Sequence, residues 1–218
     1  MASTSLPNEV QPLYETLNSE LIWIHAKWQL YRQVFAGSPE DIDLLNRTAP
    51  FFFRVVQRTL FEDVLISICR LADPSATVGK QNFSLAQLLD RIEHVAPATL
   101  LGKLTTLLGQ IDTGSSTFRE WRNRRIAHSD LSTALKVSEE VLPGISRQDI
   151  ELVLSPMRNF MNEVSAHYSA SEMAYDHFIS VSGGDVLLRL LYKADAEQRD
   201  ERERKEREFR AMIESESA

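Results

Sequence analysis

The sequence is poor in cysteine, with Cys69 as the single example in 218 residues. One cysteine cannot form a disulfide within the chain, and the sequence has no CxxC pair or cysteine–histidine spacing typical of a zinc site. These absences exclude a disulfide-stapled scaffold and a recognisable structural zinc site. They favour a protein of the reducing cytoplasm.

Long apolar runs are also absent. No stretch of about 18 apolar residues is available to span a bilayer. The first twelve residues, MASTSLPNEVQP, have neither the basic start nor the apolar stretch of a signal peptide. We therefore expect a cytoplasmic protein with no membrane partner.

Positive charge is in deficit, because 24 Lys and Arg residues face 31 Asp and Glu residues and the formal net charge is −7. A general coat for nucleic acid draws on a broad positive field, which this chain lacks. Any contact with nucleic acid must therefore come from a local basic patch. The 43% hydrophobic and 25% charged composition is that of an ordinary globular protein.

Apolar residues recur mainly at spacings of three and four, which is the period of one helix face. No sustained strand alternation with hairpin signals interrupts this pattern, so we predict an all-α helical bundle. The first helix ends near Gly37, a second begins at Pro39, and Pro50 breaks it near Thr48. The stripe of the first helix consists of Leu13, Leu17, Leu21, Ile24, Trp28, Tyr31 and Phe35.

Residues 51–72 are apolar almost all round, which predicts the central buried helix. A narrow polar stripe interrupts them at Thr59, Asp63, Ser67 and Arg70. Asp73 and Pro74 are expected to end this helix, and residues 75–82, SATVGKQN, to form a loop.

Two four-residue segments have the pattern of a capping box and predict helix starts at 84–87 and 117–120, and Ser146-Arg147-Gln148-Asp149 is predicted to cap a further helix. Pro97 opens a further helix, and Pro156 should kink the one that follows residue 146. The last helix begins at Ser182-Gly183-Gly184-Asp185 and continues into a charge run. Its predicted pairs at i,i+4 are Asp200 with Arg204, Glu201 with Lys205, Glu203 with Arg207 and Glu206 with Arg210.

Residues 121–130, WRNRRIAHSD, concentrate arginine in an otherwise acidic chain. On an ideal α-helix, with about 100° per residue, Phe118, Arg122 and Ile126 fall along one side. Arg122 then lies inside an apolar arc, where its guanidinium must find an acceptor. His128 lies roughly 120° around the same helix, so both residues can border one groove.

Arg122-Asn123, four further residues and His128 resemble the arginine, polar residue, spacer and histidine signature of the HEPN superfamily of helical nucleotide- and RNA-associated domains. RLADP at 70–74, NFSL at 82–85 and WRNRRIAHSDL at 121–131 resemble, in this order, its AbiU-type abortive-infection branch. The likeness extends over about residues 10–170. It implies a HEPN-type helical domain, which we place over residues 1–178. The charge pairs of the last helix predict a charged C-terminal helix over 179–218 that could project from the body.

The resemblance also implies a metal-independent endoribonuclease toxin of antiviral defence, built as a homodimer in which two copies of the motif form one site. His128 would exchange protons with the ribose 2′-hydroxyl or the leaving oxygen. Arg122 would bind phosphate oxygens as charge develops, and Asn123 would orient them. RNA is then the expected substrate, an antitoxin or other protein is a possible partner, and no metal or cofactor is expected.

Several assignments stay open at this point. Either Arg124 or Arg125, rather than Arg122, could be the helical neighbour of His128. Together with Arg119, these two arginines form either an RNA-binding rim or ordinary helix surface. Asp63 or Arg70 could support Arg122 from the central helix. The remaining histidines are expected to be structural or exposed, namely His25, His94, His167 and His177.

The principal alternative is a noncatalytic helical dimer or a nucleotide- or RNA-binding interaction module. In that case the motif holds the structure together, Arg122 is paired internally, for instance with Asp63, and the charged C-terminal helix recruits a partner.

Overall fold

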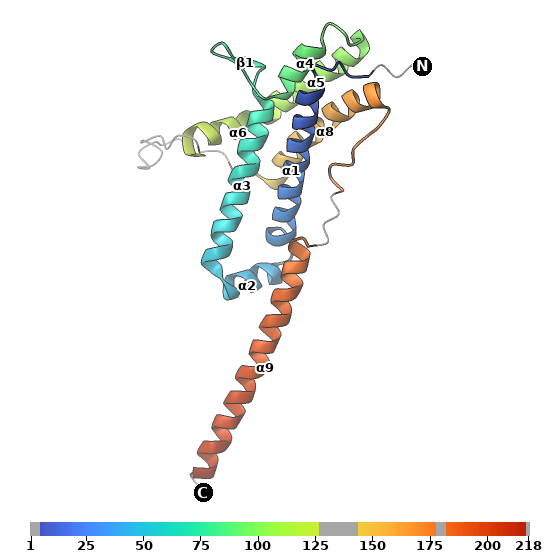
Figure 1. The fold of residues 1–218 in the computed structure, drawn as a ribbon. Coiled ribbons are helices and arrows are strands. Elements are labelled where there is room, and N and C mark those ends of the chain that lie inside the picture. Colours follow the sequence, from blue (N-terminus) through green and yellow to red (C-terminus); the bar gives the residue numbers. More distant parts are fainter. Residues whose placement is uncertain (1–4, 127–143, 178–181, 217–218) are drawn as a thin grey trace. The chain divides into compact units, whose positions relative to one another are not determined.

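The computed structural model describes residues 5–126, 144–177 and 182–216. These residues are almost entirely helical, which confirms the predicted all-α class (Figure 1). Within them, no helix is long and apolar enough to cross a membrane. The α-helices are α1 (Gln11–Phe35), α2 (Pro39–Thr48), α3 (Pro50–Ala72), α4 (Leu85–Ile92), α5 (Ala98–Gly114), α6 (Ser116–Trp121), α8 (Arg147–Ser169) and α9 (Gly184–Glu216).

The chain divides into two compact units. The first unit contains Met1–Trp28 and Leu60–Phe178, and the second contains Gln29–Thr59 and Ile179–Ala218. Residues 29–59 thus group with the C-terminal helix, an association that the sequence pattern did not suggest. The predicted division between residues 178 and 179 remains a prediction.

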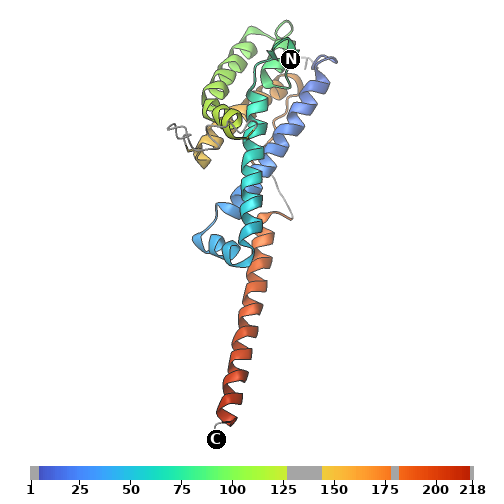
Figure 2. The same cartoon turned by 90° about the vertical axis from the view of Figure 1, so that its left-hand side faces the viewer.

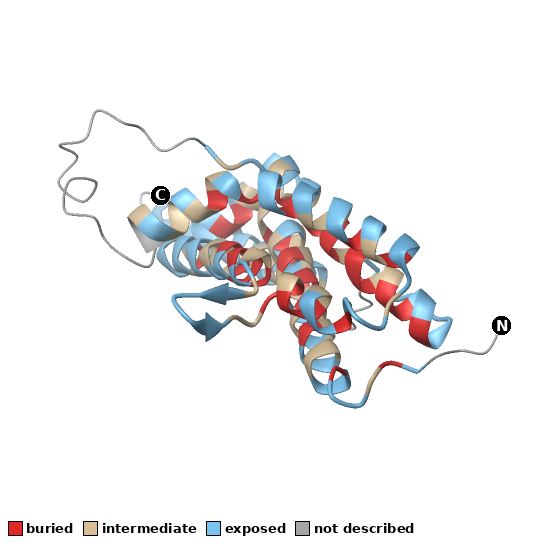
Figure 3. Ribbon diagram, turned by 90° about the horizontal axis from the view of Figure 1, so that it is seen from above, coloured by how far each residue is buried: buried red, intermediate tan, exposed pale blue. Residues whose placement is uncertain are grey.

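The core of the first unit includes the packing of α5 against α8. Leu104 and Ile111 of α5 and Met157 and Phe160 of α8 are buried. At Gly114 the helices approach so closely that a Cβ atom would lie 2.8 Å from the Val153 side chain. Buried residues occupy faces of the helices and alternate with exposed ones (Figure 3).

The expected burial of the whole 51–72 helix is wrong for its first turns. Phe51 is 80% exposed and Phe52 59% exposed, whereas the later part of α3 is buried at Val64, Leu65 and Ile68. The first turns belong to the small second unit. A unit of so few residues buries a smaller fraction of its surface than a large domain does. It therefore has too few residues to cover a helix on every side.

The second unit has its own apolar cluster, in which Val34, Leu45, Phe53 and Leu188 are buried. Arg47 of α2 and Asp195 of α9 form a bidentate pair, with Nε–Oδ1 3.1 Å and Nη2–Oδ2 2.8 Å. These contacts fasten the beginning of α9 within this unit.

Helix α9 continues as a single exposed helix through the charge run (Figure 2). Its Glu201–Lys205 pair forms at 2.7 Å, as predicted. Arg204, however, lies 3.9 Å from Glu208 on the next turn. Exposed pairs of this kind contribute little individually, so their choice of partner is only weakly determined.

The predicted helix caps differ in how completely they form, and the cap predicted at Ser146 is a full capping box. At Ser146 both halves are present, because its hydroxyl accepts from Asp149 N at 3.2 Å and its own N–H donates to Asp149 Oδ2 at 2.7 Å. At Ser84 the hydroxyl accepts from Gln87 N at 3.3 Å, and the structure has no return bond from the Gln87 amide. The box predicted at 117–120 does not form, because α6 already begins at Ser116.

The predicted loop after Pro74 contains a two-residue antiparallel hairpin of β1 (Ala76–Thr77) and β2 (Lys80–Gln81). Gly79 at its tip has φ +75°, a backbone conformation that suits glycine. The Asn82 amide donates to the Pro74 carbonyl at 2.8 Å and to Thr77 Oγ1 at 2.7 Å. The hairpin is thereby tied to the end of α3.

Candidate active site

The arginine-rich segment begins where α6 gives way to a π-helix, η1 (Arg122–Ile126). Phe118 is completely buried and anchors α6, and Arg122 follows it by four residues. A π-helix closes its hydrogen bonds between residues five apart, so each residue advances by less than on an α-helix. The angle of about 120° predicted between Arg122 and His128 assumed an ideal α-helix, and it does not apply across this segment.

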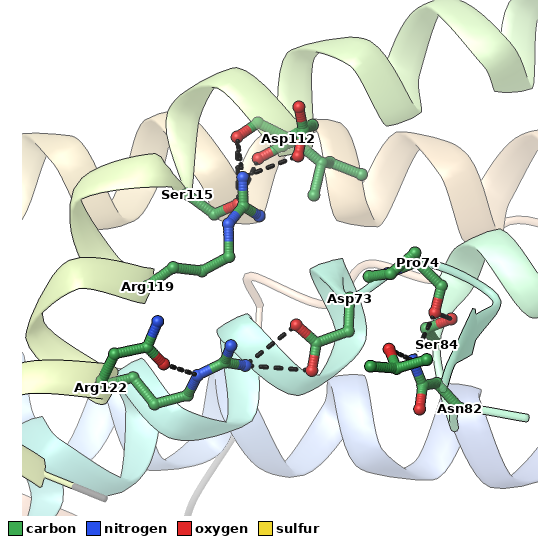
Figure 4. Close-up of polar contacts among 11 residues, drawn as sticks. Asp73, Pro74, Asn82, Ser84, Asp112, Ser115, Arg119 and Arg122 are labelled. Carbon is green, nitrogen blue, oxygen red and sulfur yellow. Dashed lines mark hydrogen bonds and ion pairs between the residues drawn. The ribbon is translucent and has the colours of Figure 1, made fainter. Parts of the chain in front are cut away.

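Arg122 has an acidic partner on another element, as its position in the apolar arc required. Its Nη1 donates to both carboxylate oxygens of Asp73, at 2.9 and 3.0 Å, directly after α3 (Figure 4). The Arg122 Nε donates to Asn123 Oδ1 at 3.2 Å. The two side chains of the ion pair are 24% and 26% exposed, so the pair is partly shielded from water.

One end of the Arg122 guanidinium remains available. Within the described part of the chain, Nη1 and Nε are engaged, and Nη2 makes no hydrogen bond. A guanidinium held in this way has a defined orientation and still presents a charged donor to an oxyanion. The arrangement suits a phosphate oxygen approaching from the solvent side.

Arg119, three residues earlier, is held by a different set of acceptors. It donates to Ser115 Oγ at 2.8 Å, to the Asp112 carbonyl at 2.8 Å and to Asp112 Oδ1 at 2.7 Å (Figure 4). These bonds join the end of α5 to α6. They show how the residue supports the fold, and they leave its proposed contact with RNA untested.

Cys69 lies one helical turn before Asp73 and is buried. Burial raises the pKa of its thiol to about 11, an effect that Asp73 reinforces and that the positive charges of Arg122 and Arg119 oppose. The thiol is therefore protonated at neutral pH, despite the positive charges of Arg122 and Arg119.

This environment predicts that Cys69 in the folded protein is inert to thiol reagents. At pH 8 about one thiol in a thousand is ionised at such a pKa, and the thiolate is the nucleophile. Titration with Ellman's reagent should give no reaction in buffer and one equivalent in denaturant. Rapid reaction of the folded protein at pH 8 would contradict the burial of this side chain.

The other predicted site residues are distributed as follows. Asp63 pairs with Lys27 at 2.5 Å, and Arg70 pairs with Glu20, so the proposed support of Arg122 from these two residues is not present in the described structure. Arg124 is part of η1 and half-buried. The Arg125 side chain and all of His128 lie outside the described residues, so the geometry between Arg122 and His128 is a prediction.

The sequence does not predict that Asp73 is the acidic partner of Arg122. Asp73 was expected to end a helix and organise the following loop, and its contact with Arg122 spans 49 positions in the sequence. A signal existed in RLADP at 70–74, which carried part of the family resemblance. Nothing in that segment alone connects its aspartate to an arginine on a later helix.

The HEPN_AbiU2 family model, described as AbiU2, matches residues 7–187. The chain belongs to the AbiU2 family of HEPN proteins. The match includes Asp73, Arg122 and the segment that contains His128, and it confirms the predicted superfamily and branch. No curated protein and no solved structure matches the chain. Membership in AbiU2 therefore makes this a HEPN-type abortive-infection protein.

Proposed function

We propose that this AbiU2 protein is a metal-independent endoribonuclease toxin of antiviral defence, in which two copies of the chain form the RNA-cleaving site. The observation that carries the proposal is the state of Arg122. Asp73 and Asn123 hold Nη1 and Nε, and Nη2 has no hydrogen bond among the described residues. This open donor can bond directly to a phosphate oxygen while the other guanidinium nitrogens stay held.

The chemistry follows from groups that the chain supplies. The neutral imidazole of His128 accepts the proton of a ribose 2′-hydroxyl, and the oxygen attacks the adjacent phosphorus. The P–O bond to the next nucleotide breaks, which leaves a 2′,3′-cyclic phosphate and a 5′-hydroxyl. Arg122 stabilises the additional negative charge on the phosphate oxygens during this step.

A second copy supplies the second proton carrier. One imidazole removes a proton while another protonates the leaving oxygen, and each chain has only one motif histidine. In a two-fold dimer, the two copies of His128 and Arg122 are equivalent and can share one groove. Arg119, Arg124 and Arg125 would contact flanking phosphates, which offsets the acidic balance of the whole chain.

A noncatalytic helical dimer or RNA-binding module is the second candidate, and a specific contact favours it. Arg122 is paired internally, as that hypothesis requires, although with Asp73 instead of Asp63. In this case the pair would only fasten η1 to the end of α3, and the charged helix α9 would recruit a protein partner.

The test is cleavage of a labelled RNA by the purified full chain in the presence of EDTA. We expect the wild type to cleave and His128→Ala to lose at least about 100-fold in rate, as general acid–base catalysis is removed. His177→Ala, a change at an exposed position outside the motif, provides the matched control for loss of a histidine. Unchanged cleavage by His128→Ala would overturn the mechanism, and absence of cleavage by the wild type would favour the second candidate.

A further inference from the structure

A cavity lined by both polar and apolar groups lies beside the hairpin of the first unit, outside the arginine motif. It has a volume of about 530 Å³, within the usual range for small-molecule sites. Its wall comes from the segment before α1, the hairpin and α4. The lining includes Glu9, Ser75, Gln81, Gln87, Asp90 and Arg91.

The Gln87 side chain is the unusual member of this lining. It is only 7% exposed, and its amide makes no hydrogen bond among the described residues. In a complete capping box this amide would bond back to the backbone of Ser84, as the carboxylates of Asp41 and Asp149 do at their own boxes. Gln87 lines the cavity and its amide group reaches the solvent there, so the amide donor and acceptor are both open to a ligand.

The neighbours of Gln87 extend the same polar stripe. Asp90 and Arg91 follow at i+3 and i+4 and line the cavity with it. Arg91 is only loosely held, by long bonds to the Glu9 carbonyl at 3.5 Å and to Gln81 Oε1 at 3.4 Å. The opposite face of α4 is buried at Leu88 and Ile92, so the helix is fixed and presents this stripe outward.

The charges of the wall indicate what kind of ligand fits. Glu9 and Asp90 outnumber Arg91, so the cavity has no excess of positive charge for a phosphate. It offers instead an amide with donor and acceptor side by side, a carboxylate and a guanidinium. This combination matches the edge of a neutral heterocycle.

We propose that this cavity binds an unstacked nucleobase, with the Gln87 amide reading its edge and adenine preferred. An amide forms a bidentate pair with adenine, donating to a ring nitrogen and accepting from the amino group. The inference rests on the proposed function, because it makes the cavity a base-specificity site for the RNA substrate.

The chain links this cavity to Arg122. Ser75 lines the cavity and follows Asp73 by two residues, so their Cα atoms are at most about 7.6 Å apart. The Pro74 carbonyl between them accepts from both Asn82 and Ser84, which fixes the connection (Figure 4). A nucleotide near the site can thus place its base beside the hairpin while a neighbouring phosphate meets Arg122.

The experiment measures binding of fluorescent single-stranded oligomers of about 12 nucleotides to the full chain. Oligo(A), oligo(C) and oligo(U) are compared by fluorescence anisotropy in the His128→Ala variant, which leaves the probe intact. We expect oligo(A) to bind about tenfold more tightly than oligo(C) or oligo(U). Adding Gln87→Met, which keeps an unbranched side chain of similar length but removes the amide, should reduce this preference to less than about twofold.

Gln110→Met, at an exposed position of α5, is the matched control and should keep the preference. Circular dichroism establishes that both variants fold. A preference that survives Gln87→Met, or equal binding of the three oligomers before it, overturns the proposal. Competition with AMP identifies the source of the base: displacement that depends on Gln87 assigns the cavity to free nucleotides as well, and its absence restricts the cavity to RNA strands.

The ribonuclease proposal and the base-site proposal can each be overturned without the other. If the wild type does not cleave RNA but Gln87 determines the preference for oligo(A), the ribonuclease proposal falls and the base site stands. If RNA is cleaved and Gln87→Met leaves the base preference unchanged, the base-site proposal falls and the ribonuclease proposal stands.

Discussion

Replacing Arg122 with alanine should reduce RNA cleavage by about 10²- to 10³-fold, the effect of removing one preorganised donor to a developing oxyanion. Arg122→Lys should recover only part of the rate, because an ammonium group keeps the charge and loses the planar fork. Single-turnover cleavage measures the chemical step in each variant.

The partner of Arg122 provides a second readout. Asp73→Asn keeps the positive charge of Arg122 but weakens the ion pair that orients it. We expect a smaller loss of rate than in Arg122→Ala, and a double variant close to Arg122→Ala alone, because the aspartate acts through the arginine. Rate losses that simply add would show that Asp73 has a role independent of Arg122.

A matched pair elsewhere separates catalysis from stability. Arg47 and Asp195 form a comparable bidentate pair in the second unit, and Arg47→Ala should lower stability without lowering the cleavage rate of the folded protein. If Arg122→Ala lowers only the melting temperature, as Arg47→Ala does, Arg122 is a structural residue and the noncatalytic candidate is correct.

Phe118→Ala should lower the free energy of unfolding of the first unit by about 3–5 kcal/mol, the usual cost of truncating a buried phenylalanine. Phe118 is completely buried on α6, one turn before Arg122. Its removal leaves a cavity under the short helix that positions the arginine. Urea denaturation followed by circular dichroism measures the change.

Phe209→Ala is the control for this prediction, because Phe209 is 59% exposed on α9 and its truncation should change stability by less than about 0.5 kcal/mol. A loss at Phe118 no larger than at Phe209 would contradict the packing of α6. A large loss would also explain any fall in RNA cleavage at temperatures where the variant partly unfolds.

Local signals in the sequence located most helix boundaries. Proline at 39 and 50 and the cap at Ser146 begin helices in the structure because they act within one turn of the chain. The box predicted at Thr117 failed although its residues fit. Helix α5 runs on to Gly114 and α6 begins at Ser116, so the chain turns two residues earlier than that pattern required.

Burial was harder to predict from pattern alone. Phe51 and Phe52 have the composition of a core helix, yet they are exposed, because exposure depends on how many other elements reach that part of α3. The π-helix at Arg122–Ile126 was also not foreseen, since the predicted face assumed a regular α-helical turn.

The sequence by itself determined the helical class, the AbiU-type motif and the requirement that Arg122 find an acceptor, because periodicity and the charge of an arginine are properties of the residues. Only the tertiary structure decided which acceptor that is. Asp63 and Asp73 are both carboxylates at the level of sequence, and packing brings Asp73 to Arg122 while Asp63 meets Lys27. Which of two equivalent carboxylates pairs with Arg122 depends on their distances from it in space. For residues far apart in the chain, those distances are set only when the helices pack.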